Sequence, residues 1–210
     1  MQDFGFYLVM TDPAAGYAEC ARAAVRAGVK IVQLRMKRAP RGEILAAARD
    51  VRAATAGTDT LFVVDDDPAI AAECGADGVH VGQDDMPVPE VRRRYPSLRV
   101  VGLSTHNPAQ VRAAAAVRPD YIGVGPVYAT PTKAIPDPTL GLATMHEMIE
   151  LAPCPAVAIG GIDATNLPLV LAAGARNWAV VRAVCRAADP EAAIRALLAV
   201  EASAKGTAAP

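Results

Sequence analysis

Tyr121-Ile-Gly-Val-Gly-Pro-Val-Tyr-Ala-Thr-Pro-Thr-Lys133 is the stretch from which the fold and the site can both be inferred. It begins as a short apolar strand, Tyr121 to Val124, breaks at Gly125-Pro126, and continues as a loop that carries Thr130, Thr132 and Lys133. A buried strand that ends in glycine, hydroxyl groups and a lysine is a common way to build an anion site, because the glycine removes side-chain bulk and the loop supplies donors. A strand followed by an ordinary polar turn is the plainer interpretation, and the rest of the chain decides between the two.

Length and composition limit the class of protein. The chain has 210 residues, of which 52% are hydrophobic and 20% charged, with a formal net charge of −1. This is enough chain for one well-buried domain. The near-neutral balance provides no basic stripe for nucleic acid and no polybasic patch for a membrane. No apolar run approaches the ~20 residues of a membrane span, and the N-terminus does not resemble a signal peptide, so we expect a cytoplasmic protein.

Short apolar runs alternate with helix-like segments along the whole chain. The expected strands are Phe6–Met10, Ile31–Leu34, Leu61–Val64, Gly78–Val81, Val100–Leu103, Tyr121–Val124, Ala156–Ile159 and Trp178–Val181. The expected helices are Tyr17–Ala27, Arg41–Ala54, Pro68–Cys74, Pro87–Arg94, Pro108–Val117, Leu140–Leu151, Asn166–Ala173 and Pro190–Ala202. Strands that are apolar on both faces are typical of a parallel sheet covered by helices.

Eight strand–helix units in a chain of this length predict an α/β fold, a single-domain (β/α)₈ TIM barrel. A doubly wound open sheet is the alternative, although no Gly-x-Gly-x-x-Gly sequence follows the first strand to support a dinucleotide fold. We expect the catalytic domain to span residues 1–202 and residues 203–210, which are small and polar, to form a flexible tail.

Active sites of such barrels lie at the carboxyl ends of the strands. Gln33, Arg35 and Lys37 follow the second expected strand at alternate positions, so their side chains should project to one face. Two cations that converge on a barrel mouth would repel each other unless an anion lies between them. An outward-facing charged rim is the competing interpretation.

Acidic residues follow the next two strands. Asp65, Asp66 and Asp67 come after the third strand, and Gln83, Asp84 and Asp85 after the fourth. Carboxylates from neighbouring strand ends, opposite a cationic set, favour Mg²⁺ held together with substrate phosphate oxygens. Alternatively, Asp67 and Asp85 cap the helices that follow them.

The remaining strand ends offer neutral donors and glycines. Ser104 follows the fifth strand and could donate to an anion, whereas we expect His80 to be a satisfied core residue and His106 to cap or pack. Gly161 follows the seventh strand and Arg182 the eighth, where barrels often bind phosphate through backbone N–H groups. The sequence therefore predicts two anion sites, one charged and suited to a metal-bound diphosphate, the other built from backbone and suited to a monophosphate.

Five segments together resemble the thiamine-phosphate synthase family over residues 6–202. They are Gln33-Leu-Arg-Met-Lys37, Gly75-Ala-Asp-Gly-Val-His-Val-Gly-Gln-Asp-Asp85, Gly102-Leu-Ser104, Tyr121 to Lys133 and Ala158-Ile-Gly-Gly-Ile162. These segments occur in the right order along the series of expected strands, which makes the resemblance far more specific than any single motif.

The resemblance implies a role for each matching residue. It implies that Gln33, Arg35, Lys37, Ser104 and Lys133 hold the diphosphate of 4-amino-2-methyl-5-pyrimidinylmethyl diphosphate and that Asp66 and Asp85 hold Mg²⁺. The second substrate would be a 4-methyl-5-(2-phosphoethyl)thiazole or its carboxylated form. Thr130 and Thr132 would contact it, with its phosphate on the backbone at Gly161, Val181 and Arg182. The products would be thiamine phosphate and pyrophosphate, and the enzyme would be a Mg²⁺-dependent transferase acting on small molecules.

Four positions depart from the family pattern. Met36 stands where Glu is usual, Asp67 where a basic residue is usual, and Arg182 where Ser is usual. Asp65 stands where an Asn usually touches the substrate, and a carboxylate beside diphosphate would repel it unless the carboxylate shares the metal or is protonated. By strand alternation we expect Met36 to point away from the site.

Two other functions remain open at this point. A thiazole tautomerase of the same superfamily would carry a His just after the sixth strand's glycine, where this chain has Pro126. A barrel that binds a phosphorylated ligand without turning it over is the other alternative. The sequence leaves open whether the protein forms a homo-oligomer and which thiazole tautomer it prefers.

Overall fold

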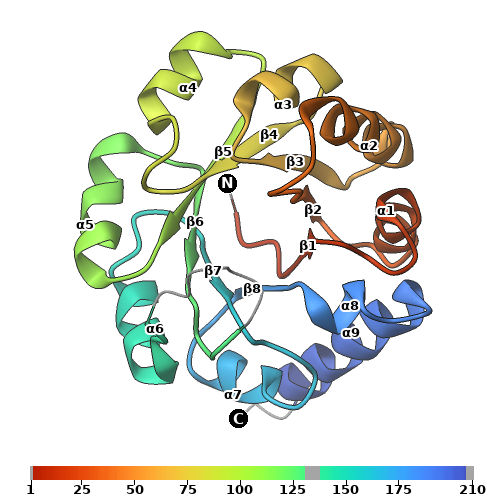
Figure 1. Cartoon of the computed structure of the whole chain (residues 1–210). Coiled ribbons are helices and arrows are strands. Elements are labelled where there is room, and N and C mark those ends of the chain that lie inside the picture. The colour runs from red at the N-terminus through yellow and green to blue at the C-terminus, as the bar shows by residue number, and fades with distance from the viewer. Residues whose placement is uncertain (1, 131–137, 207–210) are drawn as a thin grey trace.

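In the computed structural model the eight strands close into a parallel barrel surrounded by helices (Figure 1). The structure describes residues 2–130 and 138–206. The strands are β1 Phe6–Met10, β2 Ile31–Leu34, β3 Leu61–Asp65, β4 Gly78–Val81, β5 Val100–Thr105, β6 Tyr121–Val124, β7 Ala156–Ile159 and β8 Asn177–Val180. The helices within these residues are α1 Tyr17–Arg26, α2 Arg41–Thr55, α3 Pro68–Cys74, α4 Val88–Arg94, α5 Pro108–Val117, α6 Gly141–Glu150, α7 Leu167–Ala172, α8 Arg182–Cys185 and α9 Pro190–Gly206.

The predicted fold class is confirmed. Each strand pairs with its neighbours in chain order, and β8 closes onto β1, with Leu8 opposite Val180. The expected strands and helices are all present, with ends that differ by a few residues. The structure adds a short helix, α8, that the sequence analysis did not predict. Helix α9 extends to Gly206 rather than Ala202, and the flexibility of the segment after Ala202 stays a prediction.

Strand alternation divides the buried residues into two sets, because successive side chains point to opposite faces. Phe6, Leu8 and Met10 of β1 point outward and pack against the helices. Tyr7 and Val9 of the same strand point into the barrel. The inward set forms a small second core together with Ile31, Val63, Val100, Tyr121, Val157 and Ala179. The strands are therefore apolar on both faces, which explains why they are near-continuous apolar runs in the sequence.

The N-terminal segment closes one end of the barrel. Phe4 packs edge-on against Tyr7 and Tyr121, with ring centroids 6.2 and 6.1 Å away. The backbone N–H groups of Phe4 and Gly5 donate to Oδ1 of Asn177, at 2.6 and 3.1 Å. In Figure 1, which looks along the barrel, the start of the described chain projects within the ring of strands. With this end sealed, the opposite end, where the strands finish, is the open one.

Candidate active site

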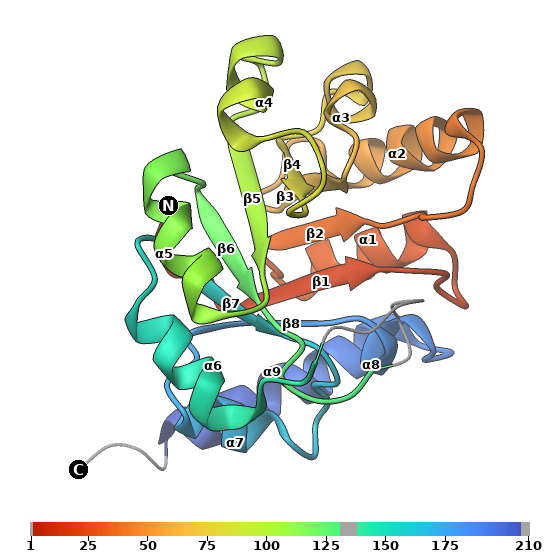
Figure 2. The ribbon, with the colours of Figure 1, turned by 60° about the vertical axis from the view of Figure 1, so that its left-hand side comes forward.

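A cavity of about 370 Å³ lies at the carboxyl ends of the strands. In Figure 2 the arrowheads of β1 and β2 point to the side on which α8 lies, and residues at the start of α8 form part of the cavity wall. The lining includes eight of the predicted site residues, namely Gln33, Arg35, Asp65, Ser104, Thr130, Gly161, Val181 and Arg182. The site thus occupies the position expected for this barrel.

Arg35 and Lys37 converge on one carboxylate at the β2–β3 side of the mouth. Arg35 Nε lies 3.4 Å and Lys37 Nζ 3.0 Å from Oδ2 of Asp65, and Lys37 also pairs with Asp66. The Arg35 and Asp65 side chains are only 13% and 9% exposed, so these charges do not form a solvated rim. The carboxylate of Asp65 supplies an anion between the two cations.

Asp65 is held in an environment that disfavours its charge. Burial, followed by the neighbouring Asp66 carboxylate, raises the pKa of Asp65 to about 6, although Lys37 and Arg35 act in the opposite direction. A carboxyl group with this pKa gains a proton more readily than an ordinary aspartate when a polyanion approaches. The Asn that is usual at this position carries no charge. Asp65 differs from it mainly in its negative charge, which Lys37 and Arg35 only partly compensate.

Asp66 and Asp85 face each other from the ends of β3 and β4. The Asp66 backbone adopts a left-handed conformation, with φ 61°, and its N–H donates to the carbonyl of His80 on β4 at 2.8 Å. Asp85 Oδ2 accepts from the N–H of Gly82 at 2.6 Å. Burial raises the pKa of Asp85, and the charge of Asp66 adds to the rise against the effect of the Gly82 hydrogen bond. The two carboxyl groups therefore form a close like-charged pair.

The capping alternative holds for one of the two aspartates. Asp67 Oδ1 accepts from the N–H of Ile70 at 2.9 Å and caps α3. Asp85 does not cap α4, whose N-cap residue is Pro87, because its carboxylate is turned back toward Gly82. The Asp67 side chain is thus engaged in capping α3. Met36 packs against the outer core, as expected, so neither of these two departures alters the cavity wall.

The opposite side of the cavity is built from backbone. Gly160 and Gly161 have φ of 104° and 66°, values that side-chain-bearing residues rarely adopt. A Cβ at Gly161 would lie 2.7 Å from Cβ of Tyr128 and 2.9 Å from the carbonyl oxygen of Ala129. Glycine here lets the loops after β6 and β7 pack against each other. Val181 and Arg182 follow β8, where α8 begins, and line the same side.

The family follows from a comparison with known proteins. A family model described as "Thiamine monophosphate synthase" matches residues 6–184. The chain belongs to this family. The resemblance inferred from the five sequence segments is therefore confirmed.

Comparison with individual proteins leads to the same thiamine monophosphate synthase family. A thiamine-phosphate synthase of Anaeromyxobacter dehalogenans is 44% identical over 90% of this chain and 84% of its own length. One of Laribacter hongkongensis is 40% identical over 96% and 97%. The chain spans only 53% of a third, from Gloeobacter violaceus, at 45% identity. A solved thiamine phosphate pyrophosphorylase from Pyrococcus furiosus superposes with a TM-score of 0.87 at 30% identity, covering 96% of this chain and 97% of that one. These findings confirm the expected transferase reaction of thiamine-phosphate synthase.

For this family member, the residues proposed from sequence fall into three groups. Gln33, Arg35, Asp65, Ser104, Thr130, Gly161, Val181 and Arg182 line the cavity. Three further residues, Lys37, Asp66 and Asp85, do not line the cavity but lie next to it. Lys37 pairs with Asp65 and Asp66, and Asp66 in turn interacts with Asp85. Thr132 and Lys133 lie outside the described residues, so their roles stay predictions.

The carboxylate pair fits a hard divalent cation. Two partly exposed aspartates held close together present the oxygen ligands that Mg²⁺ takes when a substrate phosphate completes its shell. In residues 2–130 and 138–206, no group of three or more His, Cys, Asp or Glu is arranged around a single point. The donor set therefore suits an ion bound jointly with a diphosphate.

Within residues 2–130 and 138–206, no helix is long and apolar enough to span a membrane.

Sequence reasoning missed the polar chain that lines the floor of the cavity. Tyr7, His80 and Tyr121 all point into the barrel and line the cavity together with His106. His80 is satisfied by hydrogen bonds, as expected, but at the cavity wall rather than in a closed core. Strand alternation could have found these residues, since Tyr7, His80 and Tyr121 occupy inward positions of β1, β4 and β6.

Proposed function

We propose that the chain joins a pyrimidinylmethyl diphosphate to a thiazole phosphate by loss of diphosphate from the pyrimidine and capture of the resulting cation by the thiazole nitrogen. The observation that carries this proposal is the construction of one cavity from two different anion-binding sides. One side has cations and carboxylates on β2–β4, and the other has glycine backbone after β7 and β8. Two substrates that each carry phosphate need such a division.

At the charged side, Arg35 and Lys37 bind the diphosphate and stabilise the negative charge that grows on it as the carbon–oxygen bond breaks. Ser104 adds a neutral donor from β5. Asp66 and Asp85 would hold Mg²⁺, which would supply positive charge beside the departing diphosphate. Because both cations pair with Asp65, diphosphate that binds here takes over ion pairs already formed with a carboxylate.

At the backbone side, the thiazole phosphate rests on N–H groups near Gly161, Val181 and Arg182, and Thr130 contacts the ring. Glycine at position 161 lets the loops after β6 and β7 pack closely, which fixes the position of the backbone N–H groups that the phosphate contacts. Alignment of the thiazole nitrogen with the pyrimidine carbon then makes the capture step effectively intramolecular. The reaction needs no nucleophilic side chain, because the delocalised pyrimidine cation reacts directly with the thiazole nitrogen.

The charged side also argues against the thiazole tautomerase, which acts on a single monophosphate. Such an isomerase has no use for Arg35, Lys37 and a carboxylate pair, and Pro126 stands where it would carry a histidine. The ligand-binding barrel without turnover makes a different prediction from the synthase, namely binding of both substrates with no product.

The test is pyrophosphate release by the purified protein with Mg²⁺ and both substrates, each omitted in turn, with thiamine phosphate identified by mass spectrometry. We expect one pyrophosphate per thiamine phosphate, with both substrates required and EDTA abolishing release. Binding of both substrates without release would contradict the proposal and favour the ligand-binding barrel. A native mass spectrum of the same sample shows whether the protein forms a homo-oligomer.

A further inference from the structure

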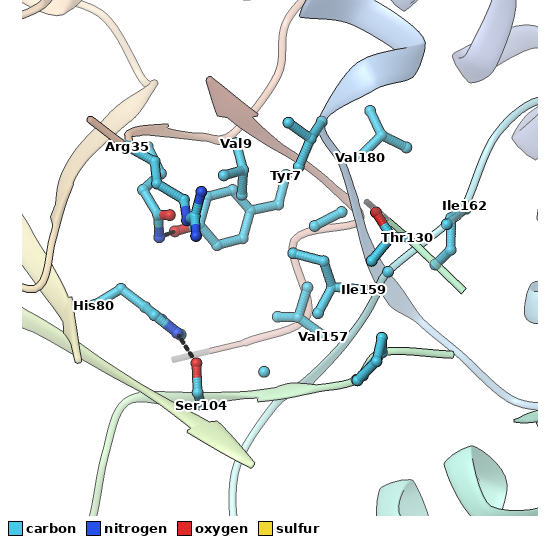
Figure 3. A pocket seen from close by; sticks show the side chains of 18 of the residues that line it. Tyr7, Val9, Arg35, His80, Ser104, Thr130, Val157, Ile159, Ile162 and Val180 are labelled. Atoms are coloured by element: carbon cyan, nitrogen blue, oxygen red, sulfur yellow. Dashed lines mark hydrogen bonds between the residues drawn. The ribbon is translucent and has the colours of Figure 1, made fainter. Parts of the chain in front are cut away.

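A continuous chain of hydrogen bonds crosses the interior of the barrel beneath the cavity. Gln33 Nε2 donates to the hydroxyl of Tyr7 at 2.8 Å, and that hydroxyl lies 2.8 Å from the hydroxyl of Tyr121. The Tyr121 hydroxyl lies 3.0 Å from Nδ1 of His80, and His80 Nε2 lies 2.8 Å from Oγ of Ser104. Figure 3 shows the last of these bonds, with Ser104 at the cavity wall. The chain links β2, β1, β6, β4 and β5 in turn.

The fold makes room for this chain at Gly102. A Cβ on Gly102 would lie 2.2 Å from Cζ of Tyr121 and 2.5 Å from Nδ1 of His80. The rings of His80 and Tyr121 stack there, with centroids 5.4 Å apart and planes at 28°. Glycine at this position is therefore required for the two rings to reach each other. Gly102 thus provides the space that the hydrogen-bond chain needs inside the barrel.

One direction of the chain uses every hydroxyl proton within it. Burial raises the pKa of both Tyr7 and Tyr121, so each hydroxyl keeps its single proton. The Gln33 amide nitrogen can only donate. Tyr7 accepts from Gln33, and in this direction it donates to Tyr121, which in turn donates to Nδ1 of His80. His80 then carries its proton on Nε2 and donates to Ser104.

We infer that His80 is a positioning residue that turns the Ser104 hydroxyl proton toward the departing diphosphate. A serine hydroxyl both donates and accepts, and beside a polyanion only the donating orientation stabilises. Because Ser104 accepts from His80, its own proton points away from His80, on the side that lines the cavity. The reversed chain would have Ser104 donate to His80 and present lone pairs to the diphosphate. This inference rests on the proposed function, since it concerns how that site treats its leaving group.

The direct test on the wild-type chain is the position of the imidazole proton. In ¹⁵N-labelled full-length protein with Mg²⁺ and inorganic pyrophosphate, long-range ¹H–¹⁵N spectra distinguish the two tautomers. The chain has three histidines, and the signal lost in His80→Gln assigns His80. We expect a neutral ring protonated on Nε2. A ring protonated on Nδ1, or on both nitrogens, would overturn the inference.

Kinetics supply the second test through two matched variants. The amide nitrogen of His80→Gln can stand near Nε2 and donate to Ser104, whereas the shorter His80→Asn can replace only the contact with Tyr121. We expect His80→Asn to lower kcat about tenfold with a smaller change in KM for the pyrimidine diphosphate, since one donor to a developing charge is lost. His80→Gln should remain within about threefold of wild type, on the same reasoning. His146→Asn, at an exposed histidine of α6, is the control.

A double-mutant cycle separates positioning from structural damage. If His80 acts through Ser104, then His80→Asn should cost nothing further in the Ser104→Ala background. An equal loss in both backgrounds would overturn the inference, and failure of His80→Asn to fold would leave the tautomer measurement to decide. A wild-type protein that releases no pyrophosphate contradicts the proposed function instead, whatever the tautomer of His80.

Discussion

The two sides of the cavity differ in what they offer to an anion. On the β2–β4 side, Arg35 and Lys37 supply full charges and are held by Asp65 and Asp66. On the β7–β8 side, Gly160 and Gly161 offer backbone in a conformation that only glycine adopts readily. The first side depends on charge and is sensitive to protonation and metal. The second side depends on shape and backbone geometry.

The difference shows how one barrel can distinguish two phosphate-bearing substrates. A diphosphate that leaves during the reaction needs charge stabilisation that increases as the bond breaks. A monophosphate that only anchors its substrate needs a fixed position and equal binding in the ground state and the transition state. Changes on the charged side should therefore act mainly on kcat, and changes on the glycine side mainly on KM for the thiazole phosphate.

The largest effect is expected from Arg35→Met. Removing a buried cation that faces the diphosphate should lower pyrophosphate release by about 10²–10³-fold, as for loss of one transition-state donor, with little change in KM for the thiazole phosphate. Steady-state assays with each substrate varied check this. Arg38→Met is the matched control, because Arg38 is exposed in the same loop. Near-normal kcat in Arg35→Met would remove Arg35 from the diphosphate site.

Gly161→Ala should give the complementary result. The left-handed φ of 66° and the 2.7 Å approach to Cβ of Tyr128 force the loop to move. A side chain in this conformation costs about 1–2 kcal/mol, so we expect KM for the thiazole phosphate to rise about tenfold while KM for the pyrimidine diphosphate stays near wild type. Gly42→Ala in α2 is the control, since its Cβ would meet nothing within 4 Å. An equal rise in both KM values would contradict the division between the two sides.

Asp85→Asn should raise the Mg²⁺ concentration needed for half-maximal rate by about tenfold, the lower end of what loss of a metal-site residue costs. The reason is that one of the two carboxylates facing the ion loses its charge. The neighbouring Asp84, which is exposed, provides the control Asp84→Asn. Mg²⁺ titrations of the initial rate measure both variants. An unchanged titration curve in Asp85→Asn would exclude Asp85 from the metal site.

Asp65→Asn should have the smallest effect on rate but a characteristic effect on stability. The folded-state pKa of about 6 lies above the ordinary 3.8, so the folded protein holds the proton more tightly than the unfolded chain. Wild-type stability should therefore fall as pH rises from about 4 to 6, and the variant should lack this fall. The advantage of Asp65→Asn should grow by about 2–3 kcal/mol across this range, at 1.36 kcal/mol per pKa unit. Urea unfolding at pH 4, 5, 6 and 7 measures it, and a constant difference would contradict the raised pKa.

Much of the fold followed from the sequence because each strand is an apolar run with a clear end. Strand alternation predicted that the side chains of Gln33, Arg35 and Lys37 lie together. Gln33 and Arg35 line the cavity, whereas Lys37 lies beyond the end of β2 and is connected to the cavity wall through its ion pair with Asp65. Helix α8 was missed because four residues, Arg182–Cys185, are too few to show a helical period. The direction of the Asp85 side chain was not predictable either, since it depends on a hydrogen bond from Gly82.

The interior hydrogen-bond chain shows the limit of sequence reasoning more clearly. Tyr7 and Tyr121 are 114 positions apart, and their contact exists only because the barrel closes. His80 by itself resembles any buried histidine. Only the register of β4 with β5, which places His80 beside Gly102, reveals that it reaches Tyr121 and Ser104.

Isothermal titration of wild-type protein with Mg²⁺ and inorganic pyrophosphate, with and without saturating thiazole phosphate, tests the central claim of two separate anion sites. We predict that pyrophosphate binds in a Mg²⁺-dependent manner in both conditions, with affinities within about threefold, and that Arg35→Met loses this binding while keeping the thiazole phosphate. Competition between the two ligands for one site would contradict the account.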